Sequence, residues 1–168
     1  MISLLKGIVR SIASDRAVVE VGGVGLAVTI TPATSALLNI GAPAQFYTSL
    51  VVREDSLTLF GFLDDEVRTL FELVQTVSGI GPKVAMSIVA ALTPSQLGVA
   101  VAQEDISAIE KVPGIGRKGA QRLILELKGK LSDFGTSHKS AHHQPVWREQ
   151  LASALCHLVL PRKNLIPQ

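Results

Sequence analysis

The segment VSGIGPKVA at residues 77–85 recurs 35 positions later as VPGIGRKGA at residues 112–120. The correspondence continues along the chain, so that Ile88 aligns with Leu123. A Gly-Ile-Gly turn between two helical segments, repeated in register, indicates an internal duplication. The sequence therefore predicts an all-helical domain built from two copies of a helix, a tight turn and a second helix.

Each repeated turn predicts an anion site. Glycine has no Cβ and permits both a tight turn and the close approach of another backbone. The helix that follows begins with unpaired N–H groups and a partial positive charge. We expect Ile80 and Ile115 to turn inward and anchor the turns, and Lys83 and Lys118 to add charge-assisted contacts to a phosphate. Backbone amides cannot read base edges, so the predicted ligand is the DNA backbone, without sequence preference.

Basic side chains gather after the second turn. The formal net charge of the chain is +2 and indicates no partner by itself. Between positions 117 and 130, however, only Glu126 opposes five basic residues, which are Arg117, Lys118, Arg122, Lys128 and Lys130. From its place on the helix face, Arg122 is an additional candidate for binding DNA.

The repeated turns have two other interpretations, a dinucleotide-binding motif and a pair of hairpins used only for packing. Residues 114–119 satisfy G-x-G-x-x-G, the dinucleotide fingerprint, but that motif follows a strand and precedes an acid on a second strand. Here AIEKVP precedes it and a linker-like segment follows, so we reject that interpretation. The remaining alternative is a pair of αα-hairpins that serve only for packing.

Residues 1–63 have the composition of strands. Short β-rich runs are separated by turn residues and by one small helical insert between Pro32 and Gly41. The runs are GIVRSIA, RAVVEV, VGLAVTIT, AQFYTSLVV and SLTLFGF. About five short antiparallel strands predict a compact barrel, with an OB-like fold as the candidate.

From Asp64 the apolar period becomes helical, with Asp64 as the expected N-cap. The all-α domain is predicted to span residues 64–131. Its later helices are expected at 82–91, 94–102, 105–111 and 116–131. Residues 132–146 lose the periodicity and are interpreted as a flexible linker.

The stretch VVREDSLTLFGF at residues 51–62 predicts a β-hairpin whose tip carries Glu54 and Asp55. These acids are candidates for catalysis, for metal binding, for an ordinary solvated turn or for a surface that repels phosphate. Adjacent tip residues point in different directions and do not converge on a pocket, so we expect no catalytic residue and no metal ligand here. We favour the repulsive surface, an acidic pin.

Other sequence features exclude several classes of protein. Cys156 is the only cysteine, so one chain forms no disulfide and no cysteine-based zinc site. His138, His142 and His143 could bind a metal adventitiously, but only Asp133 stands at second-ligand spacing, so we expect no designed metal site. No apolar run reaches the ~18 residues of a membrane span, which predicts a cytoplasmic protein.

Four motifs in order closely resemble the RuvA family, the Holliday-junction-binding subunits of the bacterial branch-migration machinery. They are VGGVG at 21–25, VVREDSLTLFGF at 51–62, SGIGPK at 78–83 and VPGIGRK at 112–118. The resemblance implies an OB-fold domain, a middle domain with two helix-hairpin-helix motifs, and a homotetramer or octamer around a four-way junction. By the same resemblance, DNA lies on Gly79, Ile80, Gly81, Lys83, Gly114, Ile115, Gly116, Arg117 and Lys118.

The resemblance also implies partners. The RuvB ATPase supplies the motor of branch migration, and the RuvC resolvase is a further partner. This chain has no Walker A motif, so we expect a non-catalytic subunit without a cofactor. The alternatives left open are a helix-hairpin-helix glycosylase or nuclease, and a protein-interaction module.

The C-terminal segment departs from the family pattern. Residues 146–158, VWREQLASALCHL, resemble the first helix of the family's motor-binding third domain, and PRKNLIPQ then breaks the pattern. A lone amphipathic helix leaves its apolar face uncovered. We therefore expect residues 147–168 to form a truncated or altered third domain with weakened motor coupling.

Overall fold

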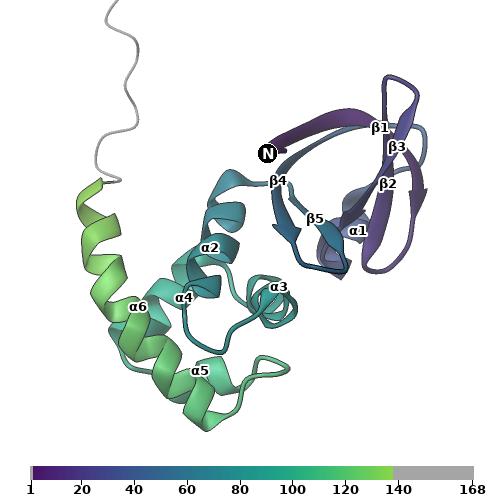
Figure 1. Cartoon of the computed structure of the whole chain (residues 1–168). Coiled ribbons are helices and arrows are strands. Elements are labelled where there is room, and N and C mark those ends of the chain that lie inside the picture. Colours follow the sequence, from purple (N-terminus) through teal and green to yellow (C-terminus); the bar gives the residue numbers. More distant parts are fainter. Residues whose placement is uncertain (1, 138–168) are drawn as a thin grey trace, which may run out of the picture. The chain divides into compact units, whose positions relative to one another are not determined.

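The computed structural model describes residues 2–137 of the 168-residue chain. The chain divides into two units, Met1–Leu131 and Ser132–Gln168. The rest of the predicted linker, the predicted third domain at 147–168 and the three histidines from 138 to 143 lie outside the described residues. Figure 1 shows the order of the elements along the chain.

Five strands close into a barrel, which confirms the predicted OB-like fold. Around the barrel the strands follow the order β1-β2-β3-β5-β4. Their bounds are β1 Leu4–Ile12, β2 Arg16–Val21, β3 Val24–Thr29, β4 Pro43–Val52 and β5 Leu57–Phe62. Four neighbouring pairs are antiparallel, whereas β3 and β5 pair in parallel. The expectation of an entirely antiparallel barrel was therefore wrong, because a closed ring with an odd number of strands must contain a parallel neighbour.

The predicted helical insert is present as α1 (Pro32–Leu37), between β3 and β4. Its N-cap is Thr31, whose hydroxyl accepts from the backbone N–H of Thr34 at 3.2 Å. Ser35 donates from its hydroxyl to the carbonyl of Ala13 at 2.7 Å, which ties the insert to the turn between β1 and β2.

The alternation of residues in β5 gives this strand two buried faces. Leu59 points into the barrel core, while Phe60 and Phe62 face the helices. Their rings pack against Phe71 of α2 (Asp65–Gln75), with centroid separations of 4.9 and 5.0 Å. Barrel and helices therefore share β5.

Five helices follow the barrel. They are α2 Asp65–Gln75, α3 Pro82–Ala91, α4 Pro94–Ala102, α5 Ile106–Glu110 and α6 Arg117–Ser137. As predicted, Asp64 caps α2, since its side chain accepts from the N–H of Glu66 at 2.9 Å. The first residues of the predicted linker, 132–137, continue α6 beyond its predicted end at 131. A helix can propagate through backbone bonds alone after its apolar stripe has ended.

No single helix among residues 2–137 is long and apolar enough to cross a membrane, and only the pair α3 and α4, bent by 95°, meets those criteria together. Their apolar residues Ile88, Leu97 and Val101 are buried in the helical core.

Gly61 of β5 is a close-approach position that can be tested. A Cβ at Gly61 would stand 2.3 Å from Cγ1 of Val28 and 3.2 Å from the ring of Phe46, both of which are fully buried. We expect Gly61→Ala to lower the free energy of unfolding by about 1–3 kcal/mol, because it overpacks the barrel core. Urea denaturation measures the change.

Gly98→Ala is the matched control, since a Cβ at Gly98 of α4 meets nothing within 4 Å. It should raise stability by up to about 1 kcal/mol through helix propensity. Equal effects of the two substitutions would contradict the packing argument.

Candidate nucleic-acid interface

The two Gly-Ile-Gly turns have the same backbone hydrogen bonds. In each, the isoleucine N–H donates to the carbonyl three residues earlier, at 3.1 Å in both copies. In each, the alanine N–H donates to the carbonyl of the second glycine, at 2.9 Å in both copies. The pairs are Ile80–Val77 with Ala85–Gly81, and Ile115–Val112 with Ala120–Gly116. The duplication predicted from the sequence is therefore a structural duplication.

The first glycine of each turn adopts a backbone conformation that other residues rarely take. Gly79 has φ of 85° and Gly114 has φ of 90°. The isoleucines that follow are buried, with 9% of Ile80 and 8% of Ile115 exposed. This confirms the prediction that both isoleucines turn inward and anchor the turns.

Both turns open onto one groove of about 150 Å³. It is lined by Ser78, Gly79, Ile80, Val84, Gly114, Ile115, Gly116, Lys118, Gly119 and Arg122. Most of the predicted DNA-binding residues are thus brought together. Three are not among the lining residues: Gly81 is the N-cap of α3, Lys83 lines a second cavity, and Arg117 is exposed at the start of α6.

The two turns differ in the donors that they offer to an anion. The first N–H groups of a helix have no partner within the helix. α3 begins with Pro82, which has no N–H, whereas α6 begins with Arg117, which has both an N–H and a guanidinium. The second turn therefore has more hydrogen-bond donors at its helix start than the first turn has.

One polar face of α6 reaches across to the first turn. Arg122, Glu126 and Lys130 follow the i, i+4, i+8 spacing of a single helix face. Arg122 Nη1 donates to the carbonyl of Ser78 at 3.3 Å, and the N–H of Ser78 donates to Glu126 Oε2 at 3.2 Å. Lys130 Nζ donates to Thr76 Oγ1 at 2.6 Å. These three side chains, the α6 ladder, hold the first turn in place against the helix of the second.

The α6 ladder corrects the predicted basic cluster. The sequence suggested that five basic residues surround the second turn, but Lys130 donates to Thr76, the C-cap of α2 shortly before the first turn. Lys128 forms an exposed ion pair with Glu104, and its hydrogen bond holds the pKa of the Glu104 carboxyl below its ordinary value. Of the five, only Lys118 and Arg122 line the groove.

Glu126 is a residue that sequence reasoning missed. In the sequence it counted only as the acid opposing the cluster, although its spacing from Arg122 was a usable signal. Its carboxylate accepts a hydrogen bond from the N–H of Ser78. The residue equivalent to Ser78 in the second turn is Pro113, which has no N–H. Neither turn therefore presents a free N–H at this position, and the donors left for an anion belong to the glycines and the helix starts.

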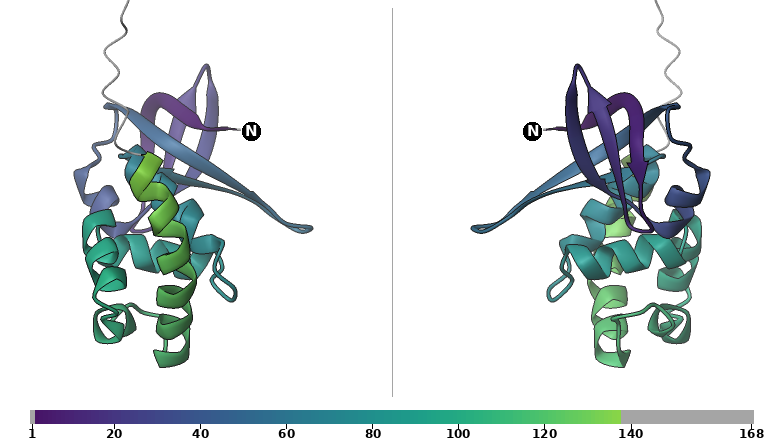
Figure 2. Two further views of the ribbon diagram at one scale, coloured as in Figure 1. Left: turned by 90° about the vertical axis from the view of Figure 1, so that its left-hand side faces the viewer. Right: turned by 90° about the vertical axis from the view of Figure 1, so that its right-hand side faces the viewer.

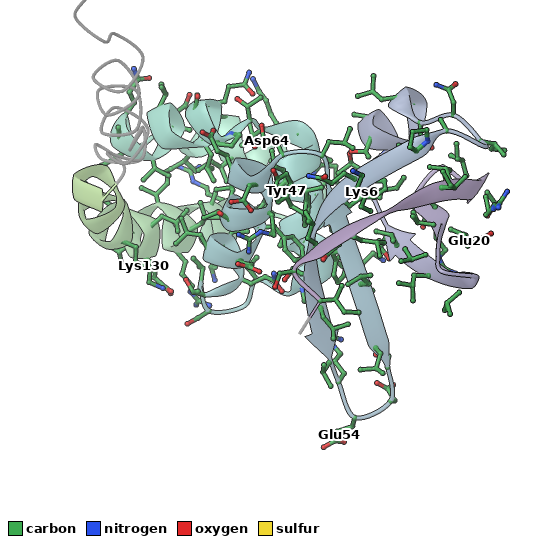
Figure 3. All side chains as sticks on the ribbon, turned by 90° about the horizontal axis from the view of Figure 1, so that it is seen from above. Lys6, Glu20, Tyr47, Glu54, Asp64 and Lys130 are labelled. Atoms are coloured by element: carbon green, nitrogen blue, oxygen red, sulfur yellow. The ribbon has the colours of Figure 1, made fainter. Side chains whose placement is uncertain are left out.

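The hairpin of β4 and β5 has the predicted four-residue tip. Pairing runs to Val52 opposite Leu57, and the N–H of Arg53 donates to the carbonyl of Ser56 at 2.8 Å. Figure 2 shows the hairpin projecting beyond the barrel, and Figure 3 labels Glu54 at its far end.

Both acids of the tip are exposed and have no ion pair among the described residues. Within residues 2–137, no group of three His, Cys, Asp or Glu side chains is placed to hold a metal ion. The hairpin itself is confirmed, whereas the repulsive role of Glu54 and Asp55 stays a prediction.

Comparison with known proteins identifies relatives of both halves. Residues 1–61 match the family model of the RuvA N terminal domain, and residues 71–130 match the SAM-like helix-hairpin-helix tandem. Among curated proteins, the chain is 52% identical over 156 residues to the Holliday junction branch migration complex subunit RuvA of Streptomyces coelicolor. That alignment covers 92% of this chain and 78% of the relative.

Two further relatives carry the same description. The protein of Beutenbergia cavernae is 55% identical over 146 residues, covering 87% of this chain and 72% of the relative. The protein of Nocardioides sp. is 45% identical over 168 residues, covering 98% of this chain and 84% of the relative.

Hydrogen exchange at Ser78 tests whether Glu126 holds the first turn in place. In Glu126→Ala the N–H of Ser78 loses its acceptor, so its hydrogen exchange should accelerate and the free energy of unfolding should fall by about 1 kcal/mol. Glu126→Gln keeps an acceptor oxygen and should restore most of the protection. Amide exchange followed by NMR measures both variants, and unchanged exchange of Ser78 in the alanine variant would contradict the bracing.

Proposed function

Because this chain belongs to the RuvA family, we propose that it binds four-way DNA junctions as the DNA-binding subunit of a Holliday junction branch migration complex. The observation that carries the proposal is the pair of equivalent Gly-Ile-Gly turns opening onto one groove. The family membership does not favour the alternatives of a repair enzyme or a protein-interaction module.

The two turns bind the sugar-phosphate backbone. Their glycines expose backbone amides, and Lys118 and Arg122 add positive charge beside them in the groove. Such contacts position a duplex arm without reading its bases. Binding is therefore independent of sequence, as a protein that follows a moving branch point requires.

The acidic tip controls which DNA shape is accepted. A carboxylate about 6 Å from a phosphate is repelled by roughly 1–3 kcal/mol at effective dielectric constants of protein surfaces. The repulsion is screened over a Debye length of about 8 Å. Where several copies of Glu54 and Asp55 surround a crossover, they disfavour folded junctions and favour an open one.

Several parts of the proposal concern assembly. The subunit acts as a homotetramer, with an octamer as the larger form, so that four hairpins meet at the crossover. It is not itself a catalyst; ATP hydrolysis belongs to a RuvB partner, and RuvC resolves the junction. Native mass spectrometry with a synthetic four-way junction reports the number of subunits and the binding of DNA together.

Replacing the tip acids tests shape selection. Glu54→Gln with Asp55→Asn should preserve or increase junction affinity and raise duplex affinity several-fold, because the repulsion is removed. Fluorescence anisotropy with a four-way junction and a linear duplex of matched sequence measures the ratio. A large loss of junction affinity would overturn the proposed role of the tip.

Replacing Lys118 tests phosphate binding in the groove. Lys118→Ala should weaken binding about equally for all DNA sequences and reduce the log–log salt slope by about 1 for each of the four subunits, or about 4 for the tetramer on a junction. Lys6→Ala on β1 of the barrel removes the same charge outside the groove and serves as control. If Lys118→Ala bound junctions as tightly as the parent chain, with the same salt slope, the groove would not be the phosphate site.

A further inference from the structure

We propose that Arg53, beside the acidic tip, is a DNA-backbone contact that completes the first Gly-Ile-Gly turn. This inference rests on the proposed function and assigns a new residue to it. The tip then attracts one phosphate through Arg53 while it repels others through Glu54 and Asp55.

The direction of Arg53 follows from the alternation of β4. Val51 packs against the helical core, whereas Leu50 packs against the barrel core. Side chains two residues apart in a strand share a face. Arg53 therefore continues the face of Val51, toward the helices, while Glu54 begins the exposed end of the turn.

The observed position agrees with this direction. Arg53 Nη2 lies 3.9 Å from the point where a Cβ on Gly81 would stand, and Gly81 is the N-cap of α3. Arg53, Pro82 and Lys83 also line one cavity of about 680 Å³ between the hairpin and α3. Arg53 of the barrel and Lys83 of α3 thus line the same cavity, and the Arg53 guanidinium lies beside the start of α3.

The guanidinium of Arg53 forms no ion pair with any of the described residues. The side chain is exposed and has no ion pair there, although Glu54 and Asp55 adjoin it in sequence. Asp15 lines the same cavity, yet it forms no ion pair with Arg53. An unpaired guanidinium offers planar, bidentate donors that match a phosphate.

Comparison of the two turns shows what Arg53 adds. The second turn has Lys118 and, one position before it, Arg117 at the start of α6. The first turn has Lys83 at the equivalent lysine position, but Pro82 replaces the arginine and also removes an N–H. Arg53 brings a guanidinium to this turn from a different part of the chain. With it, an arginine lies beside the start of α3, as Arg117 lies at the start of α6.

The location also couples binding to shape selection. A phosphate held between Arg53 and the start of α3 lies next to the acidic tip. Its position fixes where the strand stands relative to Glu54 and Asp55. Arg53 is thereby a residue that determines structure selectivity as well as affinity.

Arg53→Gln in the full chain tests the contact, with Arg53→Lys as the graded variant. Anisotropy titrations over a series of salt concentrations, with a four-way junction and a matched duplex, give the affinities and the salt slopes. We expect Arg53→Gln to weaken junction binding at least tenfold and to reduce the salt slope by about 1 for each of the four subunits, or about 4 for the tetramer. Arg53→Lys should restore the slope but only part of the affinity, because an ammonium lacks the bidentate fork.

Two comparisons make the test specific. Arg16→Gln, an exposed arginine on β2, removes the same charge from the barrel and should leave binding unchanged. In double-variant cycles, Arg53→Gln should be non-additive with Lys83→Ala, which belongs to the same turn, and additive with Lys118→Ala.

The outcomes separate this inference from the function on which it rests. If Arg53→Gln matched the parent chain in affinity and slope while Lys118→Ala lost binding, Arg53 would not be a contact and the proposed function would stand. If the parent chain itself failed to prefer the junction over the duplex, the proposed function would fail and this inference with it.

Discussion

The packing of Phe71 against Phe60 and Phe62 is the interaction on which the arrangement of the first unit depends. β5 is a wall of the barrel and, through these two rings, also a surface of the helical core. Aromatic rings in such tilted contact bury large apolar areas in a defined geometry. Because the hairpin of β4 and β5 is an extension of the same wall, this contact also sets where the tip stands relative to α3. The proximity of Arg53 to Gly81 is a consequence of that packing.

A second constraint acts within the helical half. Gly79 and Gly114 accept a left-handed backbone, which lets the following isoleucines turn into the core. The backbone conformation of the glycines would by itself leave the two turns independent of each other. The α6 ladder joins them. Arg122 and Glu126, on the helix that begins at the second turn, form hydrogen bonds with the backbone C=O and the backbone N–H of Ser78, respectively. The α6 ladder therefore sets the spacing between the two turns.

The two Gly-Ile-Gly turns have the same backbone hydrogen bonds but differ in the side chains and donors around them. Proline replaces arginine at the start of α3, and Pro113 replaces Ser78 at the position that Glu126 caps. The turn that begins with proline is also the turn that receives Arg53 from the barrel and the α6 ladder from the other repeat. Residues distant in sequence therefore contact the first turn from the barrel and from the second repeat.

The sequence by itself determined the local features. Strand alternation, the capping Asp64 and the repeated glycines predicted the barrel, the helices and the two turns, because each depends only on near neighbours in the chain. It did not determine the parallel pair of β3 and β5, which is imposed by closure of a five-stranded ring. It also missed the role of Glu126, the pairing of Lys128 with Glu104 and the approach of Arg53 to Gly81. Only the tertiary structure decided these, because such contacts join segments more than 20 residues apart whose separation is set by the packing of helices against a sheet.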